Sequence, residues 1–409
     1  MASHLKVVQS VPAEPGVHVI RSDAEALDVV GRLAASFRTG AIARDQKRIL
    51  PREEIEALTQ AGFFGIAVPK EHGGADVSAV TVSKVFRLLS AADPSIGQIP
   101  QNHFCWVPTV ANGTAEQAAF FFKRFLAGDR IGNAHSEDTK RRPNDYVHDL
   151  RKVEGGWRIT GRKYYSTGAL FAQWIPFTAH FDRDGQHEAF IYFVDANGAG
   201  IELIDDWDGM GQRLTASGTT IFTDVFVPDH HVFPMLPPGA DGRSYSLNAG
   251  LIHAAIDLGI ADEVLADAAD YIRENNRPWN GNPNAHHWEE PFVVREFGKF
   301  GVKLRTAALV LEAAAGKIDH ARALPSEHAV LEARLAVADA RLLCSEAATH
   351  IADQFFLLTG ARATLGKYGL DRHWRNARTH SLHDPLRWKE FHLGNYYLNG
   401  QMPPPGSYL

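Results

Sequence analysis

The chain has 409 residues, more than one typical domain contains, so it can form two or three hydrophobic cores and a deep, dry site. Its composition, 45% hydrophobic and 22% charged, is that of an ordinary folded protein, and its net charge of −6 provides no excess positive charge for phosphate groups. These values argue against a disordered chain and against a nucleic-acid-binding protein.

Cysteine content and hydropathy indicate a cytoplasmic protein. Cys105 and Cys344 are the only cysteines. They are too few for a disulfide framework or a cysteine-based zinc site, as expected in a reducing compartment. The first twenty residues contain no apolar segment of signal-peptide length, and no stretch approaches the roughly 20 apolar residues that span a bilayer. We therefore expect no membrane partner.

The first predicted domain, residues 20–128, is mostly helical. Ser22 and Glu25 form a capping-box pattern ahead of apolar residues at helical spacing. Thr114 and Gln117 repeat this pattern near the end of the domain, where Gly128 is a typical helix terminator.

The second predicted domain, residues 129–236, is built from strands. Apolar and polar residues alternate within 153–168 and 177–194, around Gly-Gly and Asp-Gly turns, which is the pattern of β-hairpins. The segment 228–242 then interrupts the pattern with prolines and glycines, as a connection between domains does.

The third predicted domain, residues 237–409, is a bundle of long helices. Apolar residues recur every seven positions from Leu251 to Ile272, and they alternate steps of three and four from Phe297 to Ile318. Such spacing is typical of near-antiparallel helices packed along a common seam.

Five segments in the same order resemble the acyl-CoA dehydrogenase superfamily, and together they extend over nearly the whole chain. They are GFFGIAVPKEHGG (62–74), the helix 115–127 with the following GDRIGNAHSED, WRITGRKYYSTG (157–168), ASGTTIFTDVFVP (216–228) and YGLDRHWRNAR (368–378). The resemblance implies an α+β fold: an N-terminal helical domain, a middle β-barrel or β-sandwich domain and a C-terminal four-helix bundle.

The resemblance is closer to one branch, the reduced-flavin monooxygenases typified by dibenzothiophene monooxygenase and the sulfur-acquisition oxidoreductases of the dimethyl-sulfone pathway. The matching segments are 204–218, 275–279, 359–362, 375–385 and 398–406. This implies oxygenation of a small organosulfur or related compound through a flavin hydroperoxide, with reduced FMN (FMNH2), or alternatively FAD, as the cofactor. It also implies a homotetramer and a separate NAD(P)H-dependent flavin reductase. No G-x-G-x-x-G follows a strand in the sequence, so a nicotinamide site in the chain itself is not indicated.

His380 and His383 admit three interpretations: zinc ligands with Asp384, a catalytic pair, or core histidines. The resemblance assigns His383 to the protonation of the oxygen-transfer intermediate, a task that imidazole suits near neutral pH. Acyl-CoA dehydrogenases place a catalytic glutamate in this segment, where the present chain has Asp384 followed by Pro385. That departure argues against dehydrogenation.

The resemblance also places a set of residues against the flavin. The predicted cofactor-binding residues are Asn133, Ala134, His135, Ser136, Glu137, Asp138, Lys163, Tyr164, Tyr165, Ser166, Thr167, Arg277, Ala361, Arg362 and His383. Arg277 and Arg362 match the positions that hold the flavin phosphate, and Arg277 is expected to reach a neighbouring subunit's site. A guanidinium can grip phosphate with paired hydrogen bonds, although an arginine at a helix end can also be a solvated cap.

The predicted substrate-binding residues are Gln98, Asn102, His103 and Trp207, and the predicted catalytic residues are His383, Thr167, Asn133 and His103. Gln98 and Asn102 replace a ring-bearing pair of the dibenzothiophene enzymes, which suggests a smaller or more polar substrate. Thr167 keeps the hydroxyl of the serine found there in those enzymes. The rival hypotheses are an FAD-dependent acyl-CoA dehydrogenase-like oxidoreductase, a non-catalytic binding protein that keeps the fold, and a zinc hydrolase.

Overall fold

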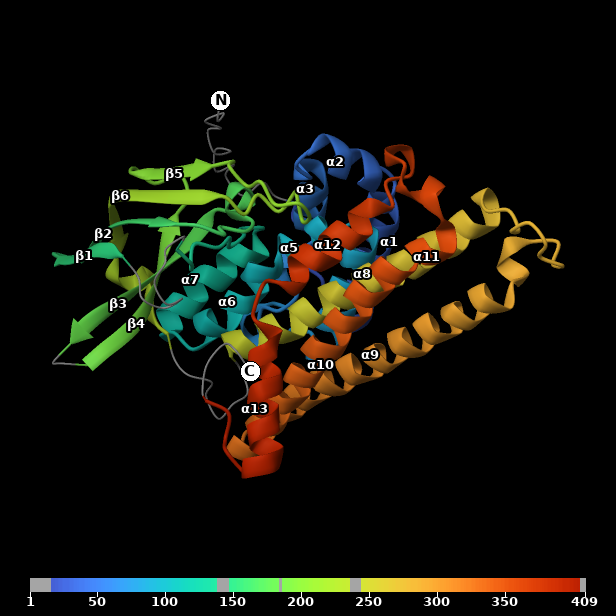
Figure 1. Cartoon of the computed structure of the whole chain (residues 1–409). Helices are drawn as coiled ribbons and strands as arrows, with labels where there is room; N and C mark the ends of the chain where they lie inside the picture. Colours follow the sequence, from blue (N-terminus) through green and yellow to red (C-terminus); the bar gives the residue numbers. More distant parts are fainter. Residues whose placement is uncertain (1–15, 138–146, 184–185, 236–243, 405–409) are drawn as a thin grey trace.

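The computed structural model describes residues 16–137, 147–183, 186–235 and 244–404, arranged as a helical region, a β region and a second helical region (Figure 1). This order confirms the predicted α+β architecture. The boundary expected between 128 and 129 falls between the last N-terminal helix and the first strand, and the one expected at 236–237 lies outside the described residues. The bounds of the three domains stay predictions.

The N-terminal region comprises α1 (Asp23–Arg38), α2 (Ala41–Lys47), α3 (Arg52–Gln60), α4 (Ala79–Ala92), α5 (Pro94–Gln98), α6 (Gln101–Ala111) and α7 (Ala115–Leu126). Thr114 and Gln117 form the expected reciprocal capping box at α7. At α1 only half of the box is present. The Ser22 hydroxyl accepts from the Glu25 amide, but the Glu25 carboxylate binds the amide of Arg21 at 2.8 Å instead of that of Ser22.

The middle region contains β1 (His148–Val153), β2 (Gly156–Lys163), β3 (Trp174–Arg183), β4 (Gln186–Asp195), β5 (Ile201–Ile204), β6 (Thr219–Pro228) and β7 (Val232–Pro234). They form two antiparallel sheets, ordered β1-β2-β6-β5 and β3-β4-β7. Rings of Phe177, Tyr192 and Phe222 pack edge-on in the core of this region. The predicted hairpins are therefore present.

The C-terminal region contains α8 (Tyr245–Asn275), α9 (Pro291–Ala323), α10 (Glu327–Gln354), α11 (Phe356–Thr359), α12 (Asp371–Ser381) and α13 (Leu386–Asn399). Of the seven-residue seam, Leu251, Leu258 and Ile272 are buried, and Leu265 is partly buried against the same core. The long helices α8, α9 and α10 pack on one another, and α12 packs on α8 and α10 as the shorter fourth member.

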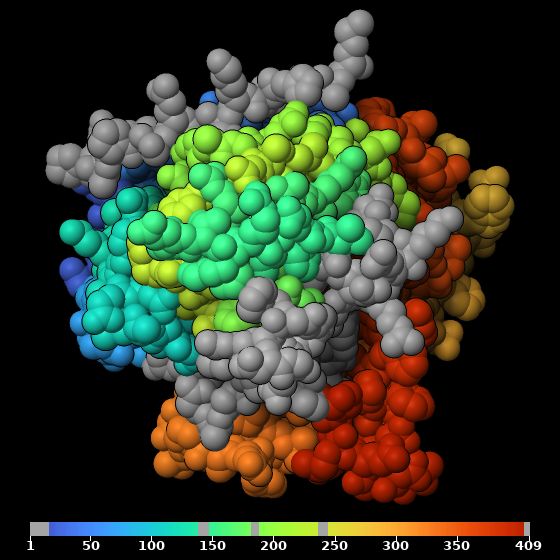
Figure 2. Space-filling view, turned by 90° about the vertical axis from the view of Figure 1, so that its left-hand side faces the viewer, coloured from blue at the N-terminus to red at the C-terminus, as the bar shows by residue number. Residues whose placement is uncertain are grey.

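The regions are in close contact, and this contact builds the site. α8 packs against α4 so closely that a Cβ at Gly259 would lie 2.5 Å from the Arg87 carbonyl oxygen. Figure 2 shows the β region between the N-terminal helices on one side and the red C-terminal helices on the other. Among the helices that the structure describes, none combines the length and the apolar character needed to cross a bilayer.

Candidate active site

A cavity of about 510 Å³ lies where the three regions meet. Its walls come from α5 and α6, from the segments 133–136 and 165–167, from the loop before β6, and from α8, α10, α12 and the residues that follow α12. Nine of the predicted site residues line it: Gln98, Asn102, Asn133, His135, Ser136, Tyr165, Thr167, Trp207 and His383. Three of the sequence segments that carried the resemblance, 157–168, 204–218 and 375–385, thus meet at this cavity.

The loop before β6 reaches the cavity because it is fastened to α12. The Gln212 amide donates to Asn376 Oδ1 at 2.7 Å, and Arg375 donates to the Met210 carbonyl at 3.0 Å. Gly211 lets the two backbones meet, since a Cβ there would lie 2.0 Å from the Arg375 carbonyl oxygen. The Trp207 indole donates to the Gln212 carbonyl at 2.9 Å, so Trp207 is a fixed part of the wall.

Some predicted cofactor residues support the wall without lining it. Ala134 is buried in an isolated bridge to Phe177, and Tyr164 packs edge-on against Tyr165. Lys163 is buried and pairs with Glu137 at 2.9 Å; burial lowers the pKa of Lys163 to about 8, against the opposing effect of Glu137. Ser166 is also buried but does not line the cavity, and Asp138 lies outside the described residues.

The structure places His103, which the sequence assigned to catalysis and to the substrate wall, in the packed interior between α6 and its neighbours. His103 does not line the cavity. Its Nε2 donates to the Phe64 carbonyl at 2.8 Å, and its Nδ1 accepts from the Ile131 amide at 3.3 Å. Because both ring nitrogens are satisfied by backbone groups and the residue is fully buried, His103 is a structural histidine.

Arg277, Ala361 and Arg362 are exposed and lie away from this cavity. The segments that carry them are neighbours: the Asn276 amide group donates to the Leu358 carbonyl at 3.1 Å. Within one chain these arginines do not line the cavity, and their assignment to a flavin phosphate stays a prediction.

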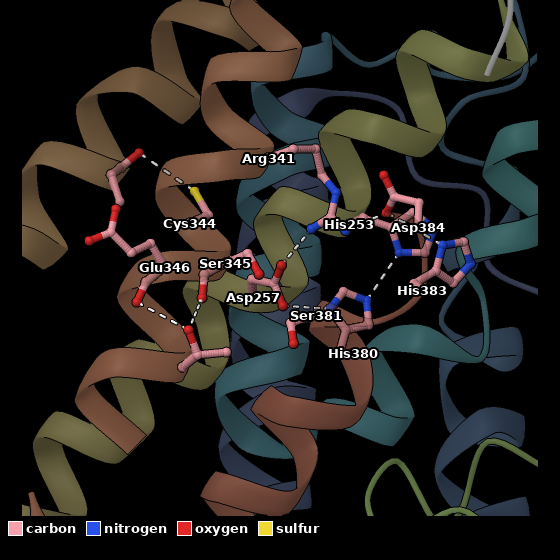
Figure 3. A network of polar contacts seen from close by, with 12 residues as sticks. His253, Asp257, Arg341, Cys344, Ser345, Glu346, His380, Ser381, His383 and Asp384 are labelled. Atoms are coloured by element: carbon pink, nitrogen blue, oxygen red, sulfur yellow. Dashed lines mark hydrogen bonds and ion pairs between the residues drawn. The ribbon is translucent and has the colours of Figure 1, made fainter. Parts of the chain in front are cut away.

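A network of ionizable side chains forms the bundle side of the cavity (Figure 3). The ring of His253, on α8, packs against the ring of His383, with centroids 3.8 Å apart. His253 Nδ1 lies 3.0 Å from His380 Nε2. His380 Nδ1 in turn lies 2.6 Å from Asp257 Oδ1. The sequence did not predict His253 or Asp257 as site residues. Their only signal was that both are polar residues, one turn apart, within the otherwise apolar stretch 249–261 of α8.

Arg341 of α10 holds the network together, because it binds Asp257 with one nitrogen and Asp384 with another. Lys389 also contacts Asp384, at 3.0 Å. Burial favours the neutral acid at Asp384, but Arg341 and Lys389 outweigh it, and the pKa of Asp384 lies well below its usual range. Asp384 is therefore a fixed anion rather than a free base.

The two inner histidines are neutral. Burial, followed by the nearby His383 and His380, holds the pKa of His253 well below 6.5, and burial likewise lowers the pKa of His380 despite the attraction of Asp257. Both ring nitrogens of His380 are engaged in the network, so none is left for a metal. Within the described residues, no group of three or more His, Cys, Asp or Glu side chains is placed to hold a metal ion.

Several buried polar atoms of the cavity wall have no hydrogen-bond partner within the described part of the chain. They are Gln98 Oε1, Asn133 Oδ1, Gln212 Nε2, His253 Nε2 and Thr379 Oγ1. Buried polar atoms are ordinarily satisfied, so such a gathering indicates a wall built for a polar ligand. A flavin ring, with donors and acceptors along one edge and an apolar body, fits these residues, and bound there it would supply redox chemistry that the side chains lack.

The fold and this cavity define a flavoenzyme, and comparison with known proteins identifies the family. Residues 27–129 match the N-terminal domain of acyl-CoA dehydrogenases and residues 251–388 match their C-terminal domain. The chain belongs to the acyl-CoA dehydrogenase family and, within it, to the flavin-dependent monooxygenases.

Three comparisons place the chain in that branch. It is 32% identical to dibenzothiophene monooxygenase from Rhodococcus erythropolis, with 94% of this chain and 96% of that protein covered. It is 31% identical to the probable FMNH2-dependent monooxygenase SfnC from Pseudomonas putida, covering 94% and 97%. The crystal structure of FMN-bound TdsC from Paenibacillus sp. A11-2 superposes with a TM-score of 0.88 at 27% identity, covering 94% and 100%.

Proposed function

We propose that this protein uses FMNH2, delivered by a separate NAD(P)H-dependent flavin reductase, to insert one oxygen atom of O2 into a small organosulfur compound. The similarity to FMNH2-dependent and FMN-bound relatives over nearly the whole chain supports the cofactor and the reaction class. His383 faces the substrate, Asn133 and Thr167 hold the flavin ring, and Gln98, Asn102 and Trp207 bound the substrate.

The observation that favours oxygenation over dehydrogenation is that the cavity's carboxylate is held as an anion by paired cations. Asp384 is the only carboxylate among the cavity-lining residues that the structure describes. It is held by Arg341 and Lys389 and has a strongly lowered pKa, so it is a poor acceptor for a substrate proton. Four histidines, His135, His253, His380 and His383, line the same cavity, and an imidazole suits the proton transfer of oxygenation.

We further propose that the active protein is a cytoplasmic homotetramer in which Arg277 and Arg362 serve a neighbouring subunit's flavin phosphate. Both arginines are exposed, and large apolar side chains stand out near them: Trp279 is 82% and Leu357 77% exposed. Apolar side chains this exposed favour a contact between copies of the chain.

The test is product formation under ¹⁸O2 with FMN, NADH and a flavin reductase, over a panel of small sulfides, sulfoxides, sulfones and sulfinates. We expect one ¹⁸O atom in the product, detected by mass spectrometry, only when the reductase is present. Absence of oxygenated product, together with bleaching of bound FAD by an acyl-CoA under anaerobic conditions, would instead establish the dehydrogenase.

A further inference from the structure

A chain of three hydroxyl groups ends at the cavity on its β side. Thr167 Oγ1 lies 2.7 Å from Ser217 Oγ, which lies 2.7 Å from Thr215 Oγ1. Thr215 Oγ1 donates to the Gln212 carbonyl oxygen at 2.9 Å. All four residues line the cavity, and the three hydroxyl residues are at least 93% buried.

The directions of these hydrogen bonds follow from counting hydrogens, since each hydroxyl has only one to donate. The carbonyl oxygen of Gln212 can only accept, so it takes the hydrogen of Thr215. Ser217 must then donate to Thr215, and Thr167 must donate to Ser217. This is the one assignment that satisfies all three contacts. The hydrogen of Thr167 is therefore directed to Ser217, and the oxygen lone pairs of Thr167 remain for a ligand.

The backbone keeps this chain from rearranging. The Ser166 amide donates to the Gly218 carbonyl and the Gly168 amide donates to the Thr215 carbonyl, each at 3.1 Å, so the two segments are fixed on both sides of Thr167. Gln212 and Ala216 both have a φ of 49°, a left-handed conformation that non-glycine residues adopt at some cost and that the surrounding contacts must maintain.

We propose that Ser217 and Thr215 are positioning residues that make Thr167 a hydrogen-bond acceptor toward the cavity, so that the ligand group facing it must be a donor. The inference rests on the proposed function, because that ligand is the flavin. A reduced flavin ring carries an N–H group where the oxidised ring has a bare nitrogen. An ordered acceptor hydroxyl therefore favours the reduced cofactor, and Ser217 and Thr215 help to set that preference.

The experiment measures the dissociation constants of oxidised FMN in air and of chemically reduced FMN under anaerobic conditions, for the wild type and for Ser217→Ala. We expect the wild type to bind reduced FMN at least about ten-fold more tightly than oxidised FMN. A ten-fold ratio raises the midpoint potential of bound FMN by about 30 mV relative to free FMN. In Ser217→Ala the Thr167 hydroxyl is free to rotate and donate, so this ratio should fall several-fold.

Two further variants complete the test. Thr215→Val removes the next acceptor while keeping the side-chain shape, and it should lower the ratio in the same direction even if Ser217→Ala does not fold. Thr223→Val, an exposed hydroxyl position on β6, is the matched control and should leave the ratio unchanged.

The outcomes separate this inference from the proposed function. Equal binding of both redox forms by the wild type, or an unchanged ratio in folded Ser217→Ala and Thr215→Val, would overturn the positioning role while leaving a flavin enzyme. Failure to bind FMN in either state would overturn the proposed function, and this inference with it.

Discussion

The two walls of the cavity control protons in different ways. The bundle wall contains charged groups, Arg341, Asp257, Asp384 and Lys389, paired so that their charges balance around neutral histidines. The β wall, which includes Thr167, Thr215 and Ser217, is uncharged. The hydrogens of these three hydroxyl groups are ordered by one backbone acceptor, the Gln212 carbonyl oxygen. Charge pairing makes the first wall costly to disturb, because a lost partner leaves a buried charge. In the second wall a substitution can change the direction of a hydroxyl hydrogen bond without leaving a buried charge, so it should cost little stability.

The largest effect is expected from Arg341→Leu, which breaks the bundle wall. Asp257 and Asp384 would each keep a buried negative charge without the guanidinium that binds both. We expect a loss of about 3–5 kcal/mol in the free energy of unfolding, measured by urea denaturation. The control is Lys317→Leu, which removes an exposed ion pair with Glu332 and should cost less than about 1 kcal/mol. Similar losses for both variants would mean that the network is not a stabilising element.

The second prediction concerns chemistry at the same wall. His383→Ala removes the partly exposed imidazole that packs at a tilt against the His253 ring, and product formation should fall on the order of 100-fold because a positioned acid–base group is lost. FMN affinity should stay within about three-fold of the wild type, and consumed oxygen should appear as hydrogen peroxide. The matched control is His328→Ala, at an exposed histidine near the start of α10. Unchanged product yield would remove His383 from the mechanism.

The sequence predicted the β wall better than the bundle wall. Asn133, His135, Ser136, Tyr165 and Thr167 lie in two short segments that could be matched as continuous motifs, and all five line the cavity. In this wall, neighbours in the sequence are also neighbours in space, so a sequence motif is enough to identify them.

Of the bundle wall, the sequence singled out only the segment with His380, His383 and Asp384, because the other residues come from separate helices. His253, Arg341 and His380 are 39 or more positions apart in sequence and meet only through helix packing. A lone histidine on α8 is no signal until its neighbours are known. His103 is the opposite case: its position matched the family, but only the structure shows that its ring nitrogens bind backbone groups.

The third prediction uses pH to distinguish buried neutral histidines from paired charges. Burial lowers the pKa of His103 and of His135 to about 4, below the value of about 6.5 in the unfolded chain. Their contribution to stability is therefore complete above pH 6.5 and is lost as the pH falls toward 4. Each histidine should reduce the free energy of unfolding by about 1.4 kcal/mol per pH unit in that window, measured by urea denaturation at pH 7, 6 and 5.

Glu263 should change the free energy of unfolding with pH in the opposite direction to the two histidines. Burial raises its pKa to about 7, so acidification below pH 7 stabilises the fold through this group and offsets part of the loss from the histidines. Glu263→Gln removes the offset, and its stability should decline more steeply than that of the wild type between pH 7 and 5. A parallel decline in the two proteins would contradict this assignment.

The smallest change in product formation is expected from Thr167→Ser on the β wall. Serine keeps the hydroxyl that donates to Ser217 and removes only a methyl group, so product formation should stay within about three-fold of the wild type. Thr167→Val has nearly the shape of threonine but lacks the hydroxyl, and it should weaken reduced-FMN binding by about ten-fold, the value of roughly one lost hydrogen bond. Equal behaviour of the two variants would show that the shape of residue 167 matters and the hydroxyl does not. A difference between them, at similar stability, would establish that this wall acts through the hydrogen bonds of the Thr167 hydroxyl, whereas the bundle wall acts through charge.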